Sequence, residues 1–216
     1  MNPFLTKGLP GDSKDLIIFI LEQLHQELKK PININNINII KENLNQNIRD
    51  SVFHQFFNEF LKESSIISEL FFGFNEITNE CLNCKNRNLQ DNSIFYSYEI
   101  FNYLIFPLNE IKKKKNIKNN SSILNDNNNI SIYDCFEFNQ KNEKLEDDNK
   151  IVCNKCREKC EFIYSSRIYI SPNILILILN REIENINHLK LDFTEAIDIT
   201  PFFSKKETTQ IIYDLY

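Results

Sequence analysis

The sequence CLNC at residues 81–84 is the first of two cysteine pairs that decide the fold of the middle of this chain. The second pair is CNKC at residues 153–156. Two residues between thiols allow a tight turn to direct both sulfur atoms at one point, and two such turns form a tetrahedral site of four thiolates. Soft thiolates with no spare coordination position suit a structural Zn2+ ion. The sequence therefore predicts a structural zinc site with the ligands Cys81, Cys84, Cys153 and Cys156.

The separation of the two pairs indicates what the zinc ion connects. A compact zinc ribbon has about 15–20 residues between its pairs, and the stretch between residues 84 and 153 is far longer. The ion is therefore expected to join two hairpins that are distant in the sequence. Two other interpretations are a redox-active CxxC motif, whose thioredoxin-like βαβ context the sequence does not show, and a ribbon that folds without metal.

The two remaining cysteines are interpreted as free thiols. Cys135 lies beside the aromatic residues Tyr133 and Phe136 of a short amphipathic segment, which favours a buried thiol that packs like a small hydrophobic side chain. Cys160 follows Cys156 by four residues and competes with it as a ligand, but the CxxC spacing is matched better without Cys160.

Residues 12–30 show the periodicity of an amphipathic helix. Leucine and isoleucine recur at steps of four through this segment, and Asp12 or Ser13 can cap its N-terminus. The Asn-rich connection that follows lacks turn signals, and we expect an irregular segment with a short helix near residues 40–47. The first part of the chain is therefore expected to be mainly helical.

A second helical segment gives way to strand-like sequence. The Phe-rich residues 51–62 repeat the helical spacing behind Asp50 or Ser51 as a cap. Residues 71–84 and 93–108 are rich in aromatic and β-branched residues with partial alternation, as expected for strands. The sequence thus predicts an α+β protein whose helices come first.

The segment 112–130 separates these strands from the second cysteine pair. It is polar, charged and nearly free of aromatic residues, so burial cannot offset the entropy of ordering it, and we expect a disordered Asn/Lys-rich insertion. Ser131 then caps a short helix at 131–138, with Asp134 as an acidic variant of the capping box. The lysine run at 112–118 is not interleaved with aromatic residues, which argues against nucleic-acid binding.

The C-terminal third of the chain is predicted to form strands. The segments with strand-like composition are 161–170, 173–180, 189–193 and 196–199. The apolar run at 174–179 does not alternate with polar residues, so we expect a central strand that is covered on both faces.

The composition excludes several classes of protein. The 216 residues are 42% hydrophobic and 12% aromatic, which is typical of a globular protein. No apolar run approaches the roughly 20 residues that span a bilayer, and no secretory signal begins the sequence. We therefore expect a monomer with reduced thiols in the cytoplasm or nucleus, without membrane association. A net charge of −5 disfavours nucleic-acid binding.

A search for a nucleophile in the sequence gives a negative result. Cysteine catalysis needs a thiolate, an imidazole within hydrogen-bond reach and a group that orients the imidazole. The histidines His25, His54 and His188 neighbour no cysteine-containing or glycine-rich motif, and we interpret each as structural or solvated. The sequence contains no GxSxG, HExxH or phosphate-binding glycine loop. We therefore predict no catalytic residue in this chain.

The order of the segments resembles that of the ubiquitin-specific proteases, also called ubiquitin carboxyl-terminal hydrolases. Residues 11–30, GDSKDLIIFILEQLHQELKK, resemble the family's helix QDAxEFLxxLLxxLHxEL. Residues 65–84 and 131–156 resemble the segments that lead into its two zinc-binding pairs. Residues 172–183 resemble its PxxLxxxLKRF strand, and residues 211–216 resemble the strand before its catalytic histidine region.

Two motifs of that family have no counterpart in this sequence. They are the NxGNTCYxNS box, which holds the nucleophile, and the GGHYxxY box, which holds the general base. Single residues also differ, because Gly11 replaces a glutamine, Leu16 a phenylalanine and Asn180 the lysine of LKR. The resemblance therefore implies an interior part of a catalytic domain that is inactive by itself.

The resemblance also implies an architecture, a papain-like fold with thumb, palm and fingers. The implied parts are a helical thumb-like part at 1–70, β fingers with the zinc site at 71–111 and 151–170, the disordered insertion at 112–130, a short helix and acidic connection at 131–150, and palm-like strands at 171–216.

The function implied by the resemblance is hydrolysis of the bond after the C-terminal glycine of ubiquitin, with ubiquitin or ubiquitinated proteins as partners. Asp12 and Asp15 match acidic positions that face the ubiquitin tail in relatives, so we expect them to bind it. The alternatives are an N-cap for Asp12 and a first-turn carboxylate for Asp15. A second hypothesis is a catalytically inactive ubiquitin-binding or scaffold protein, and the flanking sequence of the parent gene distinguishes the two.

Overall fold

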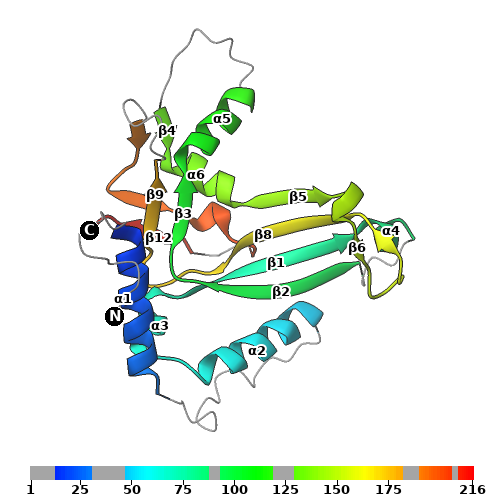
Figure 1. Cartoon of the computed structure of the whole chain (residues 1–216), viewed down its shortest axis with the longest axis horizontal. Helices are drawn as coiled ribbons and strands as arrows, with labels where there is room; N and C mark the ends of the chain where they lie inside the picture. The colour runs from blue at the N-terminus through cyan, green and yellow to red at the C-terminus, as the bar shows by residue number, and fades with distance from the viewer. Residues whose placement is uncertain (1–12, 31–46, 88–92, 119–128, 182–189, 206–208) are drawn as a thin grey trace, which may run out of the picture.

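The computed structural model shows a long antiparallel sheet with helices at one end and a cysteine-rich tip at the other (Figure 1). The residues that the structure describes are 13–30, 47–87, 93–118, 129–181, 190–205 and 209–216. Among them, no helix has the length and apolar character needed to cross a membrane. The architecture is α+β, as the sequence predicts.

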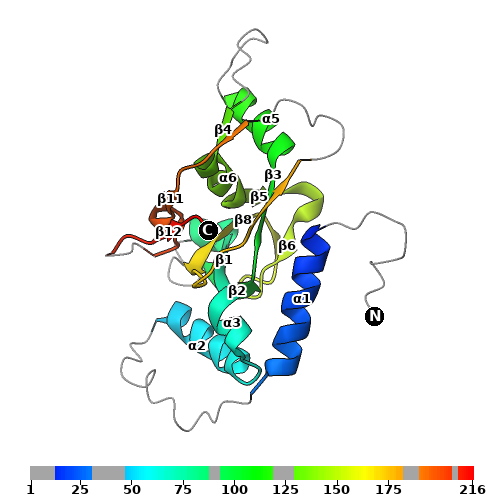
Figure 2. The ribbon, with the colours of Figure 1, turned by 90° about the vertical axis from the view of Figure 1, so that its left-hand side faces the viewer.

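The helices lie at several places around the sheet (Figures 1 and 2). They are α1 (Ser13–Leu28), α2 (Ile48–Leu61), α3 (Ile66–Phe71), α4 (Leu82–Asn86), α5 (Leu108–Lys118) and α6 (Ile132–Asn139), with 3-10 turns η4 (Asp147–Asn149) and η6 (Thr200–Phe202). Helices α1 and α3 lie side by side at one end, while α5 and α6 contact each other elsewhere in the molecule. Helix α4 lies at the tip, and α2 lies along strand β2 (Ile94–Phe101).

The first two helices confirm the helical spacing of the sequence but differ in detail. Helix α1 covers most of the predicted segment, whereas Asp12 lies outside the described residues. Helix α2 begins earlier than expected, because the Asn47 side chain accepts a hydrogen bond of 3.1 Å from the Arg49 N–H and is the N-cap. The predicted cap Asp50 instead lies in the first turn, where it binds Lys205 at 3.2 Å. Apart from Asn47, the short helix predicted near 40–47 lies outside the described residues.

The strands form one large sheet and several pairs. They are β1 (Gly73–Cys81), β2 (Ile94–Phe101), β3 (Leu104–Pro107), β4 (Asn129–Ser131), β5 (Lys141–Leu145), β6 (Ile151–Val152), β7 (Lys159–Cys160), β8 (Phe162–Ile170), β9 (Leu177–Asn180), β10 (Lys190–Asp192), β11 (Ala196–Asp198) and β12 (Ile212–Asp214). The large sheet has the order β2-β1-β8-β5, and all its pairs are antiparallel.

The long strands β1 and β8 run the length of this sheet and connect its two ends. Cys81 pairs with Phe162 at the tip, and Phe74 pairs with Ile170 at the helical end. At that end β1 begins with Gly73, where an added Cβ atom would lie 2.5 Å from Cζ of Phe101 and 2.8 Å from the carbonyl oxygen of Ile170. Only glycine therefore allows the three strands to approach this closely.

Helix α2 is held against the sheet by a buried ion pair. Glu76 on β1 is 5% exposed and accepts a hydrogen bond of 2.8 Å from Nη2 of Arg49. The hydroxyl of Tyr98 donates a second bond of 3.1 Å to this carboxylate, and Arg49 also binds Ser204 at 3.1 Å. Because each charge has several partners, the pair can be buried without an unsatisfied group.

A second core lies between α6 and strands β3 and β9. Its helix begins with the predicted capping box, in which the Ser131 hydroxyl accepts from the Asp134 N–H at 3.1 Å and the Asp134 carboxylate accepts from the Ser131 N–H at 2.8 Å. Phe136 is 1% exposed and packs between Phe106 at 5.3 Å and Phe202 at 5.0 Å, measured between ring centroids. This apolar cluster is the base of the molecule.

The prediction of disorder across 112–130 is wrong at both ends of that segment. Helix α5 continues to Lys118, and residues 129 and 130 belong to β4, whereas 119–128 lie outside the described residues. Two contacts explain the helix. Ile111 is 2% exposed in the core, and Lys115 binds the Asp134 carboxylate at 2.7 Å.

Strand β9 also differs from its prediction. The apolar run at 174–179 is neither central nor fully covered, because β9 begins at Leu177 and pairs with β3 alone among the described strands. Its leucines are half-buried and line an apolar groove of about 390 Å³. The groove also contains Leu191 of β10 and Ile197 of β11.

Two strands pair across the expected boundaries between parts of the chain. Strand β3 lies inside the range 71–111 expected for the fingers, and it pairs with β9 of the base. Strand β5 lies inside 131–150, the range expected for a short helix and an acidic connection, and it pairs with β8 in the long sheet. Neither pairing has a local signature, because the partners are more than 15 residues apart in the sequence.

Candidate metal centre

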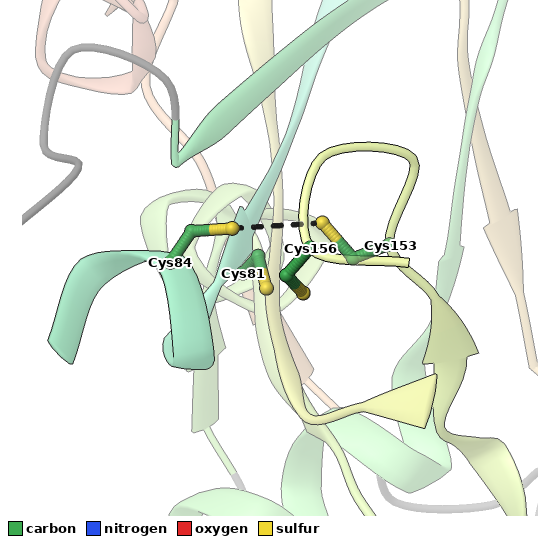
Figure 3. A group of neighbouring side chains, drawn as sticks. All are labelled: Cys81, Cys84, Cys153 and Cys156. Carbon is green, nitrogen blue, oxygen red and sulfur yellow. Dashed lines mark hydrogen bonds between the residues drawn. The ribbon is translucent and has the colours of Figure 1, made fainter. Parts of the chain in front are cut away.

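The four predicted zinc ligands come together at the tip of the long sheet (Figure 3). Cys81 is the last residue of β1, and Cys84 lies one turn later in α4. Cys153 and Cys156 lie in the turn between β6 and β7. The pairs are therefore brought together by the sheet, although they are far apart in the sequence.

The spacing of the sulfur atoms fits a tetrahedral metal site. All four lie within 4.8 Å of one another, and the Sγ atoms of Cys84 and Cys153 are 3.7 Å apart. With zinc–sulfur bonds of about 2.3 Å, the edge of a tetrahedron of thiolates measures about 3.8 Å. Cys81, Cys84 and Cys153 are at most 1% exposed, whereas Cys156 is half-buried. The donor set and its geometry therefore fit Zn2+.

The backbone of the second cysteine turn explains how two sulfur atoms point inward. The N–H of Arg157 donates to the carbonyl of Cys153 at 2.8 Å, and the N–H of Cys153 donates to the carbonyl of Glu158 at 2.9 Å. These bonds close the turn, which places Arg157 at a φ of 58° in the left-handed region. The N–H of Lys155 also points at Sγ of Cys153, 3.4 Å away.

The two cysteine turns are also joined by side chains outside the sulfur cluster. The Glu158 carboxylate, from the second turn, binds Arg87 at 3.0 Å and Asn83 at 3.2 Å in the first. The backbone N–H of Leu82 donates to the carbonyl of Glu161 at 3.1 Å. These bonds join the two turns without an ion, but the side-chain bonds are exposed and contribute little by themselves.

Without a metal ion, the buried thiols of the cluster stay protonated and do not form a group of negative charges. Burial raises the pKa of Cys84 to about 12, and hydrogen bonds with Cys81 and Cys153 add to this increase. By contrast, a hydrogen bond from the backbone N–H of Glu158 lowers the pKa of Cys156 to about 7. A zinc ion must therefore displace protons, so its affinity should fall as the pH falls.

Cys160, which the sequence presents as a competing thiol, lies beside this cluster. Its side chain is 2% exposed, and its Sγ atom lies 3.4 Å from Sγ of Cys156. Burial raises its pKa to about 12, together with hydrogen bonds to Cys156 and Cys81. The pairing of β6 with β7 places Cys160 opposite Ile151 and so brings its side chain next to the cluster.

The predicted substrate-binding residues do not form a site in the described structure. Asp12 lies outside it, and Asp15 lies in the first turn of α1, where it has an ion pair with Lys14 at 3.6 Å. The role of both residues in binding a ubiquitin tail stays a prediction.

The histidines and Cys135 do not form a catalytic pair in the described part of the chain. Nδ1 of His25 lies 2.7 Å from Oγ of Ser65, and His188 lies outside the described residues. Cys135 is fully buried, as the sequence suggests, and burial raises its pKa to about 12, which disfavours the reactive thiolate. No hydrogen bond joins a cysteine sulfur to an imidazole nitrogen among the described residues.

Known proteins show a consistent likeness to this chain. The sequence profile of the ubiquitin carboxyl-terminal hydrolase family matches residues 13–209. Human ubiquitin carboxyl-terminal hydrolase 21 is 28% identical over 161 residues, which are 72% of this chain and 25% of that protein. Ubiquitin carboxyl-terminal hydrolase 5 of Saccharomyces cerevisiae is 22% identical over 212 residues, which are 95% of this chain and 24% of that protein. The chain thus spans about a quarter of these relatives.

Solved structures share the fold. A SAGA DUB module that contains a variant of Ubp8 with Sgf11, Sus1 and Sgf73 superposes with a TM-score of 0.56 at 20% identity, covering 96% of this chain and 39% of that one. A second structure, the Ubp8 module bound to ubiquitin aldehyde, gives a TM-score of 0.52 at 18% identity, covering 94% and 37% of the two chains. At this level of identity the likeness establishes the fold alone.

Proposed function

Because this chain belongs to the ubiquitin carboxyl-terminal hydrolase family, we propose that it supplies the ubiquitin-holding part of a deubiquitinating cysteine protease. The reaction would be hydrolysis of the bond after the C-terminal glycine of ubiquitin. The observation that carries the proposal is the family match, which extends over nearly all the described residues. A related module binds ubiquitin aldehyde, which supports ubiquitin as the partner of this chain.

The long sheet is the element suited to hold a protein partner. Strands β1 and β8 have nine residues each and extend from the apolar base to the thiol cluster. A structural zinc ion would fix the two cysteine turns and thereby the shape of the tip, because all four coordination positions are occupied by protein thiolates. Zinc would therefore act on the affinity for ubiquitin and would take no part in the chemistry.

The proposed chain is a binding element without its own active site. The described residues contain no hydrogen-bonded pair of thiol and imidazole, and Cys135 is buried in the base. Without a nucleophile and base in contact, binding of the substrate does not lower the chemical barrier. We therefore propose that the chain alone does not hydrolyse ubiquitin conjugates, although the parent protein would. The same observation favours the second candidate, an inactive ubiquitin-binding or scaffold protein of this family.

The location and oligomeric state remain part of the proposal. The six cysteines are free thiols in the structure, which suits a cytoplasmic or nuclear protein. We propose a monomer whose partner is ubiquitin or a ubiquitinated protein, and neither nucleic acid nor a membrane.

Binding can be tested by titrating the zinc-loaded chain into fluorescently labelled ubiquitin and measuring anisotropy. We expect saturable binding that weakens at least about tenfold in Cys84→Ser, because the tip loses its shape. Asp15→Asn should weaken binding if this carboxylate contacts the tail, whereas Glu22→Gln on the same helix should not. An absence of saturable binding for the zinc-loaded chain would contradict the proposal.

Catalysis is tested separately with a fluorogenic ubiquitin substrate. We expect turnover equal to the buffer blank for this chain. Turnover that disappears in Cys135→Ser or Cys160→Ser would show that one of these thiols is a nucleophile. The parent reading frame then separates the two candidates, since the Cys and His boxes support the protease and their absence supports the scaffold.

A further inference from the structure

The thiol cluster contains one sulfur atom more than a tetrahedral zinc ion can bind. Cys160 is buried beside the four predicted ligands, and its sulfur is only 3.4 Å from that of Cys156. This spacing is close to the edge of about 3.8 Å between two thiolates on one zinc ion. The structure therefore places a fifth buried thiol next to one of the four predicted ligands, although only those four sulfur atoms lie within 4.8 Å of one another.

The five thiols are not equivalent, because Cys156 is the most exposed member of the predicted set. It lies in the turn and is half-buried, while the other three predicted ligands and Cys160 are buried. Cys160 belongs to β7, whose backbone is paired with β6, so its position is fixed by the sheet rather than by the turn. The most exposed predicted ligand, Cys156, thus has the buried thiol of Cys160 next to it.

A second grouping of potential ligand atoms also includes Cys160. The sulfurs of Cys156 and Cys160 and a carboxylate oxygen of Glu158 lie within 4.8 Å of one another. Glu158 is already bound to Arg87 at 3.0 Å and to Asn83 at 3.2 Å. Zn2+ prefers thiolate in such a site, so Cys160 is the better replacement.

We propose that Cys160 is a reserve zinc ligand, which takes the position of Cys156 when that residue is lost or blocked. In the exchange, the bond from zinc to Cys156 breaks and its thiolate takes up a proton from water. Cys160 loses its proton to water and forms the new bond, so the charge and the number of thiolates are unchanged. No oxidant or reductant takes part. The inference rests on zinc binding at this cluster and not on ubiquitin binding.

The experiment compares metal binding by the wild-type chain with four variants. These are Cys156→Ser, Cys160→Ser, the double variant of both, and Cys84→Ser as a matched control whose thiol is hydrogen-bonded with the other three predicted ligands. Elemental analysis gives zinc per chain, and chelator competition gives relative affinity. Co2+ substitution reports the number of thiolates through the intensity of its charge-transfer and d–d absorption bands.

Reserve ligation predicts a specific pattern. Cys156→Ser and Cys160→Ser should each keep about one zinc per chain and a four-thiolate cobalt spectrum. Cys84→Ser and the double variant should lose at least about tenfold in zinc affinity and show a three-thiolate spectrum. The proposal is overturned if Cys156→Ser behaves like Cys84→Ser. A wild-type chain without zinc would overturn the assignment of the metal site as well, whatever its affinity for ubiquitin.

A second measurement avoids dependence on the folding of a variant. The zinc-loaded wild-type chain is treated briefly with iodoacetamide, and native mass spectrometry reads the zinc content of molecules modified at Cys156 alone. We expect these molecules to retain zinc, whereas the same species in the Cys160→Ser background should lose it. Loss of zinc from both species would contradict the proposal.

Discussion

The two ends of the long sheet are held together by different physical means. At the base, Phe136 packs between Phe106 and Phe202, and the cluster is closed by burial of large apolar side chains. At the tip, the buried cluster consists of four small thiols and Phe162. A thiol buries far less apolar area than a phenyl ring, so the hydrophobic effect stabilises the base far more strongly. We therefore expect a bound metal ion to stabilise the tip more than it stabilises the base.

This difference predicts that removing zinc acts mainly on one end of the molecule. A chelator should remove the binding free energy of zinc, which is about 10–16 kcal/mol for structural zinc in small peptides at pH 7, and Cys84→Ser should remove part of it. Hydrogen exchange should become fast in β6, β7 and the tip ends of β1 and β8, and stay slow in α6 and β3. Chelator added to Cys84→Ser should extend the same loss of protection at the tip and leave the base unchanged. Equal loss of protection at both ends would show that the two regions unfold as one unit.

The reverse test removes packing from the base. Phe136→Ala should lower the free energy of unfolding by about 3–5 kcal/mol, because it leaves a cavity between two rings. Urea unfolding measures the loss, and Phe136→Leu, which keeps most of the volume, should cost less. Zinc content below half of the wild-type value in folded Phe136→Ala would contradict the independence of the tip.

A smaller effect is expected at the start of α6. Burial opposes ionisation of Asp134, but the Lys115 ammonium and the Ser131 hydroxyl and N–H lower its pKa below 3.8. Asp134→Asn should therefore cost about 1 kcal/mol at pH 7. Since the folded pKa is depressed, this stabilisation is complete above the unfolded pKa near 3.8 and disappears as the pH falls through the folded value.

Thermal unfolding across this acidic range checks the assignment of Asp134. Asp148→Asn, which removes the same charge at an exposed position, should have little effect at any pH. A cost of Asp134→Asn that is equal at pH 7 and below the folded pKa would mean that the carboxylate charge contributes nothing.

The smallest expected effect lies in the second cysteine turn. Arg157 has a φ of 58°, and a left-handed conformation costs a non-glycine residue about 1–2 kcal/mol. Arg157→Gly removes this strain but adds about 0.5–1 kcal/mol of chain entropy on unfolding. The net result should be a stabilisation of less than about 1 kcal/mol, seen as slower zinc release to a chelator. Arg157→Ala, which keeps a Cβ atom, should not give this gain, and faster release from Arg157→Gly would contradict the strain.

The parts of the structure that the sequence could predict are those set by short-range chemistry. The CxxC spacing identifies four thiols that do come together, and Ser131 with Asp134 forms the expected capping box. In each case the relevant groups are two or three residues apart, so one local turn determines their geometry. The family resemblance added the order of the segments, which the profile match over 13–209 confirms.

The errors concern partners that are distant in the sequence. Helix α5 seemed too polar to fold, but Ile111 is buried in the base and Lys115 pairs with Asp134. The spacing of Cys160 marks it only as a competing thiol, and the β6–β7 hairpin is what places its sulfur beside Cys156. The neighbouring sequence predicts neither of these contacts, because tertiary packing overrides local secondary-structure propensity at both places.

Because β1 and β8 are long, a small tilt of the sheet at its helical end gives a larger displacement at the tip. Nine residues at about 3.4 Å each span roughly 30 Å, so one degree of tilt at the base moves the tip by about 0.5 Å. At the helical end of these strands, Phe101 and Ile170 leave no room for a Cβ atom on Gly73, so this end is closely packed. A tilt of about two degrees there would move the thiol cluster by about 1 Å.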